Sequence, residues 1–181
     1  MAAADSTDIV TALKKDHESI EEHLAAVQRA DDAGRPAAFR ELTELLVRHE
    51  MAEEMVLYPA LRDLPGGAPV ADARIAEQAE AESRLSELER FRCDTTEFLT
   101  TFAQLQKSVL EHAGLEEKHV FPLLEGLAEG ARSHLGGRYV SARASAPTHP
   151  HPSAPDTPPG NRLAGPVAAL FDRMRDALGH G

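Results

Sequence analysis

Apolar residues recur at intervals of three and four along most of the chain, the periodicity of helices with one buried face. Four such stretches predict helices over about residues 7–30, 36–63, 70–91 and 94–124. Pro36 suits the first turn of the second helix, and Asp94 with Glu97 forms a potential capping box for the fourth. Long helices joined by short loops favour an all-α fold, an antiparallel up-down-up-down four-helix bundle over residues 1–127.

Beyond the predicted bundle the composition changes three times. Residues 128–143 are expected to form a short helix or a connector, and residues 144–162 a proline-rich, extended linker. Helical periodicity then returns over residues 163–181, which predicts a C-terminal amphipathic helix. We expect this helix either to dock on the bundle or to contact a partner or a second copy of the chain, so the protein is a monomer or a homodimer.

Composition and charge limit the classes of partner and the cellular location that the sequence predicts. The 181 residues carry a formal net charge of -11, which argues against a nucleic-acid partner because a phosphate backbone requires a basic surface. The N-terminus lacks the pattern of a secretory signal, and no apolar run is long enough to span a membrane. Cys93 is a single cysteine and excludes an internal disulfide. These features predict a cytoplasmic protein without a membrane partner.

Polar residues, most of them histidine or glutamate, interrupt the apolar stripe of each predicted helix. In the second helix His49 and Glu53 lie in register with the leucines of the stripe, and in the fourth His112 and Glu116 do the same. The corresponding residues are His17 in the first helix and Gln78 with Glu82 in the third. Residues four apart lie on nearly the same helix face, so imidazole and carboxylate groups from four helices are expected to converge in the core.

Buried carboxylates are costly unless a cation neutralises them, and no Lys or Arg occupies these stripes at the same level. A metal ion supplies the missing charge, and the mixed ligands suit iron, zinc or manganese. The number of ligands exceeds that of a four-coordinate structural zinc site and favours two metal ions. The simpler interpretation is a set of buried His–Glu hydrogen bonds, but two such pairs would not require His17 at a matching position.

The repeated motif resembles a known family. HxxxEE begins at His17, His49 and His112, and the second and third copies continue to Tyr58-Pro59 and Phe121-Pro122. This pattern resembles the hemerythrin family in its HHE cation-binding branch. The resemblance implies a four-helix bundle around a non-haem centre of two iron ions with an oxo or hydroxo bridge. It also implies that the following residues are metal ligands: His17, His49, Glu53, His112 and Glu116.

The third helix departs from the family pattern. Gln78 stands where the family usually has histidine, and an amide is a weak, neutral ligand, so the centre is expected to be loosened, mononuclear or partly empty. Glu82, one turn further, is the expected compensating ligand, and His119 a less favoured one. Glu22, Glu54 and Glu117 adjoin the stripes and are expected to be solvated or to support the ligands. Tyr58 and Phe121 are expected to plug the end of the bundle.

Two classes of function follow from this pattern. The leading hypothesis is a non-haem iron protein that binds, senses or reduces a small oxidant such as dioxygen, a peroxide or nitric oxide. The alternative is a bundle that has lost its metal or binds zinc, and that serves a structural or interaction role. The sequence does not decide whether the protein is an enzyme.

Overall fold

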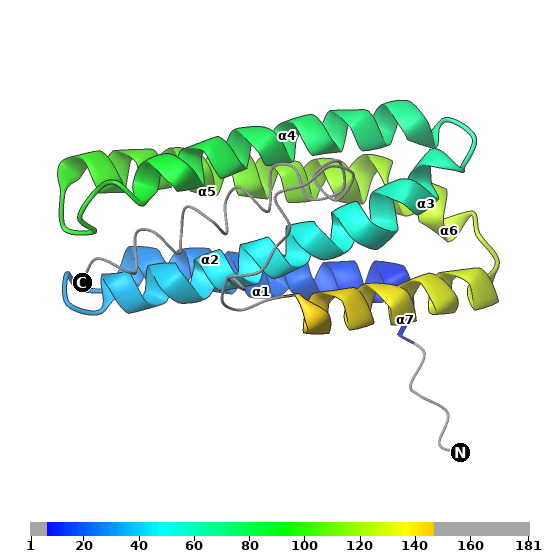
Figure 1. Ribbon diagram of the computed structural model, residues 1–181, viewed down its shortest axis with the longest axis horizontal. Coiled ribbons are helices and arrows are strands. Elements are labelled where there is room, and N and C mark those ends of the chain that lie inside the picture. The colour runs from blue at the N-terminus through cyan, green and yellow to red at the C-terminus, as the bar shows by residue number, and fades with distance from the viewer. Residues whose placement is uncertain (1–6, 147–181) are drawn as a thin grey trace, which may run out of the picture.

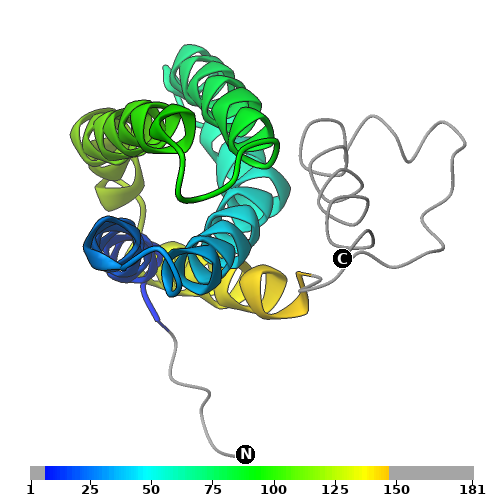
Figure 2. The ribbon, with the colours of Figure 1, turned by 90° about the vertical axis from the view of Figure 1, so that its left-hand side faces the viewer.

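The computed structural model describes residues 7–146. Four long helical runs surround a central core, and each runs antiparallel to the one before it (Figures 1 and 2). This confirms the predicted four-helix bundle. In chain order the elements are α1 (Ile9–Arg29), α2 (Arg35–Ala52), the π-helical turn η1 (Glu53–Leu57), α3 (Tyr58–Arg62), α4 (Gly67–Leu88), α5 (Thr96–His119), α6 (Phe121–Glu125) and α7 (Glu129–Ser145).

The helix starts follow local side-chain chemistry. Asp8 caps α1 by accepting a hydrogen bond from the Val10 amide at 2.9 Å. The predicted cap of the fourth helix is wrong by one residue: the Thr95 side chain accepts the Phe98 amide, because Asp94 is turned to the guanidinium of Arg92 instead. The third helix begins and ends about three residues earlier than predicted.

A π-helical turn lies inside the second run. The amide of Tyr58 donates to the carbonyl of Glu53, five residues back, so the run carries one residue more than a regular α-helical turn. Pro59 follows directly, and the wider turn allows the helix to continue to Arg62 although proline removes a donor. Glu53 is the first residue of this turn, and π-turns of this kind occur often at functional sites.

The core consists of two apolar clusters with a polar layer between them. One cluster lies toward the α1–α2 and α4–α5 loops and contains, among others, Leu24, Leu42, Leu85, Phe98 and Phe102. The other lies toward the opposite end and includes Leu13, Leu57, Leu61, Phe121 and Leu124. The predicted site residues fall between these two sets in each helix, so the apolar clusters enclose them from both ends.

A fifth long helix, α7, covers the side of the bundle formed by α1 and α2 (Figure 2). Where the sequence predicts a short helix or connector, the structure has 17 residues of helix whose Leu135, Gly136, Tyr139 and Ala142 are buried. Gly136 lies so close to the start of α1 that an added Cβ would meet the Thr7 carbonyl oxygen at 1.9 Å. The contact is extended by Arg132, whose Nε lies 2.6 Å from Asp8 Oδ2.

Across residues 7–146 no helix combines the length and the apolar character that crossing a membrane requires. The predicted proline-rich linker at 144–162 falls almost entirely outside the described residues, and the C-terminal helix at 163–181 does so completely.

Candidate metal site

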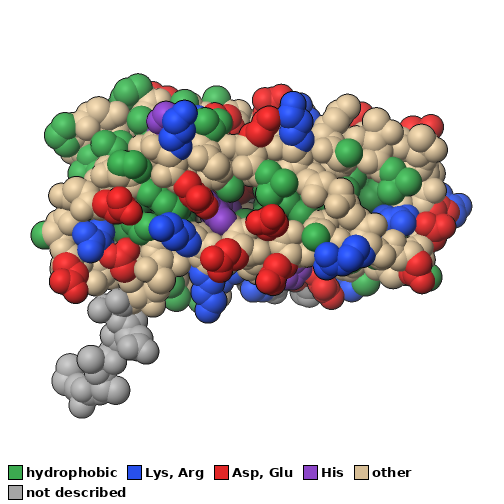
Figure 3. Space-filling model, turned by 180° about the vertical axis from the view of Figure 1, so that it is seen from behind, with side chains coloured by type: hydrophobic (Ala, Val, Ile, Leu, Met, Phe, Trp, Pro, Cys, Tyr) green, Lys and Arg blue, Asp and Glu red, His purple; other side chains and the backbone are tan. Residues whose placement is uncertain are grey.

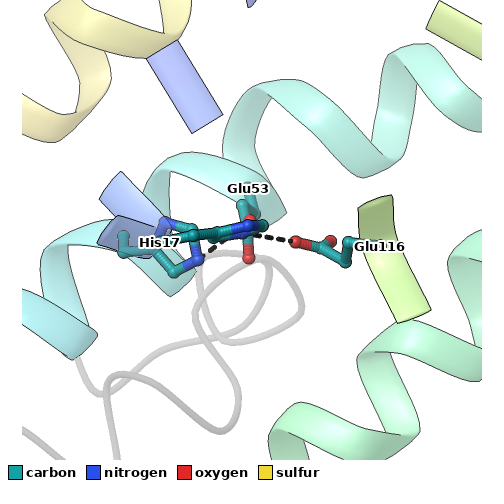
Figure 4. Close-up of side chains that lie close together, drawn as sticks. His17, Glu53 and Glu116 are labelled. Carbon is teal, nitrogen blue, oxygen red and sulfur yellow. Dashed lines mark hydrogen bonds and ion pairs between the residues drawn. The ribbon is translucent and has the colours of Figure 1, made fainter. Parts of the chain in front are cut away.

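Four of the predicted ligands meet in the polar layer. His17 of α1, His49 of α2, Glu53 of η1 and Glu116 of α5 each offer a ligand atom, and these atoms all lie within 4.8 Å of one another. Both glutamates are fully buried, and the two histidines are at most 8 % exposed. Figure 4 shows the His17 imidazole pointing to the Glu116 carboxylate, with Glu53 beside it. The helical register thus brings together side chains that lie up to 99 residues apart in sequence.

Each of the three predicted histidine ligands is held from outside the cluster through its Nδ1 atom. The Nδ1 atom of His17 lies 3.3 Å from Glu117 Oε1, and that of His112 lies 3.0 Å from Glu77 Oε2. The Nδ1 atom of His49 lies 2.8 Å from Tyr139 Oη. Carboxylates only accept, and the Tyr139 hydroxyl donates its one hydrogen to Asp16, so all three partners place the imidazole proton on Nδ1.

In the neutral form of each imidazole, the Nε2 atom consequently faces the buried carboxylates with its lone pair, whereas a protonated imidazole donates from Nε2. His17 Nε2 lies 3.2 Å from Glu116 Oε2, and His49 Nε2 lies 3.1 Å from Glu53 Oε1. His112 Nε2 lies 3.9 Å from Glu116 Oε1. Neither Glu53 Oε1 nor His112 Nε2 has a hydrogen-bond partner in the described part of the chain. A cation resolves this opposition of acceptors, and ligand histidines held through their second nitrogen are typical of metal sites. The residues therefore fit a metal ion.

The α4 side of the layer differs from the α1 side. Gln78 is buried, and its Nε2 donates to Glu53 Oε2 at 2.6 Å, so the amide nitrogen is turned to the cluster. Glu82 is also buried, one turn further along α4. His112 is only partly buried, and it does not belong to the tight group of four. The predicted ligands thus divide into a close group around Glu53 and Glu116 and a more open group beside α4.

Burial and mutual repulsion shape the charges of the site. Burial acts to raise the pKa of Glu116, but the hydrogen bond from His17 and the positive charges of the histidines outweigh it and lower the pKa to about 2. Burial, followed by the charge of Glu116, raises the pKa of Glu53 well above its usual value. The pKa values of the two neighbouring carboxyl groups are therefore shifted in opposite directions. This is expected where additional positive charge is needed to ionise both groups.

The histidines show the same competition. Burial tends to lower the pKa of His17, but the hydrogen bonds and charges of Glu116 and Glu117 outweigh it and raise the pKa. At His49 burial prevails over the Asp16 carboxylate, whose Oδ2 atom lies 3.7 Å from Nδ1, and lowers the pKa. A proton and a metal ion compete for the same Nε2 lone pairs, so metal binding to such a site depends on pH.

Comparison with known proteins agrees with this geometry. The family model described as the hemerythrin HHE cation binding domain matches residues 8–134. The chain belongs to the hemerythrin HHE cation-binding family. The matched residues run from the cap of α1 into α7, so they include every predicted ligand.

Two relatives support the family and the fold. An uncharacterized hemerythrin-like protein of Schizosaccharomyces pombe is 29 % identical over 176 residues, which cover 95 % of this chain and 87 % of that protein. The crystal structure of a hemerythrin HHE cation binding domain-containing protein from Mycobacterium kansasii is similar with a TM-score of 0.70 at 21 % sequence identity. The match covers 92 % of this chain and 99 % of that one, and at this identity it supports the fold alone.

Beyond the HHE ligand pattern, the structure reveals support for His49 that the sequence analysis missed. The Tyr139 hydroxyl of α7 donates to Asp16 Oδ2 at 2.8 Å, and Asp16 also pairs with Arg143 Nε at 2.9 Å. Asp16 and Tyr139 are both buried. The available signal was the spacing of Leu135, Tyr139 and Ala142, which gives residues 128–143 an apolar helical face.

Tyr58 is buried as predicted. It does more than fill space at the end of the bundle, because its hydroxyl contacts two of the candidate ligands. The Tyr58 hydroxyl lies 3.2 Å from Glu53 Oε2 and 3.1 Å from Glu116 Oε1, within hydrogen-bond distance of both. Burial, followed by the charge of Glu116, raises the pKa of Tyr58 well above its usual value, so the hydroxyl keeps its proton. Phe121 does pack as predicted and stacks on the His17 ring at a centroid distance of 5.9 Å.

A small cavity adjoins the cluster. His17, Ile20, Leu110 and Ala113 are among its lining residues on α1 and α5, and His49, Glu50, Gln78 and His112 line its polar part. The centre of a water-sized molecule can move within a volume of about 20 Å³, so the cavity has room for one such molecule. Leu110 is exposed, so the cavity approaches the surface at α5. On the face turned away from the viewer in Figure 1, Figure 3 shows a histidine in a hollow bordered by acidic side chains.

The residues that adjoin the predicted ligands in sequence differ in exposure and in their contacts with the site. Glu22 and His119 are exposed. His119, the less favoured compensating ligand, lies at the C-terminal end of α5 and does not belong to the group of four. Glu54 is partly buried and does not line the cavity. Glu117 is exposed through half of its side chain, yet it supports His17.

Proposed function

We propose that the site holds two iron ions and that the protein binds, senses or reduces a small oxidant, namely dioxygen, a peroxide or nitric oxide. The observation that carries the proposal is the opposition of histidine Nε2 atoms and buried glutamate oxygens, with every Nδ1 atom held from outside. This donor set of nitrogen and oxygen suits iron, with zinc and manganese as competitors. When bound, iron supplies a change of oxidation state and a Lewis acid.

The surroundings of the cluster support a small ligand. The cavity of about 20 Å³ has room for a water-sized molecule and excludes a larger organic substrate. Its apolar lining by Ile20, Leu46 and Val109 restricts the entry of bulk water. Substrates of this size include dioxygen, hydrogen peroxide and nitric oxide.

Within this class, Tyr58 favours reduction of a peroxide over reversible binding. Reversible carriage requires a pocket without a proton donor, whereas peroxide reduction consumes protons. The Tyr58 hydroxyl lies at the two central carboxylates and retains its proton over the whole neutral range. A proton donor in this position is consistent with turnover.

Metal analysis of protein expressed with supplemented iron tests the proposal. We expect close to two iron ions per chain, an absorption spectrum of bridged ferric ions, and peroxide consumption that depends on the metal. His49→Ala should lose both the metal and the activity. Wild-type protein without stoichiometric metal, or with zinc alone, would contradict the proposal and support the alternative of a structural bundle.

A further inference from the structure

Glu50 is a buried carboxylate that neither the HxxxEE motif nor the tight group of four ligands includes. It follows His49 on α2 and is 7 % exposed. It lines the same small cavity as Gln78 of α4 and His112 of α5. Three helices thus contribute polar side chains to the lining of one cavity.

Three of the polar residues that line this cavity have a buried atom without a hydrogen-bond partner. Glu50 Oε2, Gln78 Oε1 and His112 Nε2 are buried, and none of the three has a hydrogen-bond partner within residues 7–146. The orientation of Gln78 is set because its nitrogen donates to Glu53, which leaves the amide oxygen as the unpaired atom. Likewise, the contact of His112 Nδ1 with Glu77 leaves Nε2 as a lone pair. Buried acceptors without a donor are rare and costly, and one bound cation would satisfy all three at once.

Two further buried carboxyl groups, those of Glu53 and Glu82, belong to the same polar layer as Glu50. A cation in the cavity would be attracted by Glu50, Glu53 and Glu82 together.

We propose that Glu50 is a ligand of a second metal ion, bound in the cavity with His112 and Gln78. This ion would share Glu53 and Glu116 with the ion held by His17 and His49. Glu50 thereby replaces the imidazole that Gln78 does not supply. The second position is rich in oxygen donors, which suits a hard divalent cation such as Mn²⁺ or Fe²⁺.

This inference rests on the proposed function for the first metal position and adds a ligand to the second. Metal-free protein should be titrated with Mn²⁺, with bound ions counted by the loss of the free Mn²⁺ electron paramagnetic resonance signal. Iron per chain should be measured in parallel after anaerobic loading with Fe²⁺. We expect two ions in wild-type protein, one in Glu50→Ala, and at least a tenfold weaker second ion in Glu50→Gln.

Two variants serve as controls. Glu41→Gln changes the same kind of residue on the exposed face of α2, away from the cavity, and should retain two ions of wild-type affinity. The double variant Glu50→Ala with Gln78→His returns an imidazole to the α4 side and should recover the second Fe²⁺ ion. Circular dichroism should show folded Glu50→Gln, because an amide replaces a carboxyl group of the same shape.

The outcomes separate this proposal from the proposed function. Two ions of unchanged affinity in both Glu50 variants would overturn the role of Glu50 and leave the metal site intact. A single ion in wild-type protein and in both variants would overturn the second position only. Wild-type protein that binds no ion would overturn both proposals.

Discussion

The Nδ1 atom of His49 lies 2.8 Å from the phenolic oxygen of Tyr139, a residue 90 positions later on a helix outside the four-helix core. Tyr139 in turn donates to Asp16, so α7 fixes both the orientation and the tautomer of a predicted metal ligand. Helix α7 is therefore part of the candidate site, although it supplies none of the four clustered ligands.

Tyr139→Phe removes this support but keeps the ring in the core. We expect metal affinity to fall by about 10- to 100-fold, the usual effect of losing a partner of a ligand histidine. Competition with a chelator of known affinity measures the change. An affinity equal to that of wild-type protein would show that packing alone positions His49.

Gly136→Ala tests the docking of α7. The new Cβ would meet the backbone at Thr7, Asp8 and Ile9, so we expect a loss of about 1–3 kcal/mol in the free energy of unfolding. Weaker metal binding should accompany it, because Tyr139 moves with α7. Urea unfolding of metal-free protein and a chelator titration measure the two effects.

Gly137→Ala is the matched control for this variant. An added Cβ at Gly137 meets nothing within 4 Å, and the residue is exposed. Alanine should instead stabilise the helix by about 0.5–1 kcal/mol without any change in metal affinity. Equal effects of the two substitutions would argue against a close approach of α7 to α1.

Glu116 and Glu117 are adjacent carboxylates that contact opposite nitrogens of the same imidazole, that of His17. Glu116→Gln should abolish stoichiometric metal binding, because the residue is fully buried and central to the cluster. Glu117→Gln should weaken binding far less, since its half-exposed side chain is replaceable by water. Metal analysis of both purified variants distinguishes a ligand from its support, and similar losses would contradict the assignment.

Asp8 gives the fold a pH-dependent contribution. Burial acts to raise the pKa of Asp8, but the hydrogen bonds from Arg132 and the α1 backbone outweigh it and lower the pKa below 3.8. Stability from the ionised carboxylate is therefore present above pH 3.8 and lost as the pH falls through the lower value of the folded state. At pH 7, Asp8→Ala should cost about 1 kcal/mol as a lost helix cap.

Thermal unfolding of both proteins from pH 7 down to pH 3 measures this contribution. The difference between wild-type protein and Asp8→Ala should narrow once the pH is below 3.8. A constant difference over the whole range would show that the charge of Asp8 plays no part.

The sequence by itself determined the helices, the bundle and the residues of the polar layer. The positions of His49, Glu53, His112 and Glu116 within apolar stripes of period 3.6 required them to face the core, because rotating any helix would expose its leucines. The repeated HxxxEE motif, which combines this register with ligand residues, indicated the HHE family. Local errors were confined to helix ends, such as Asp94, where several side chains compete for one cap.

Only the tertiary structure decided which partners these side chains meet. Helical periodicity fixes the direction of a side chain but not the distance between helices, so it could not separate the tight group around Glu116 from the looser one around His112. It also gave no sign that Tyr139 reaches His49 or that Glu50 lines the cavity, because both contacts depend on how α7 and the π-turn at Glu53 are packed. Contacts between distant segments arise from packing, and the pattern within one helix does not contain them.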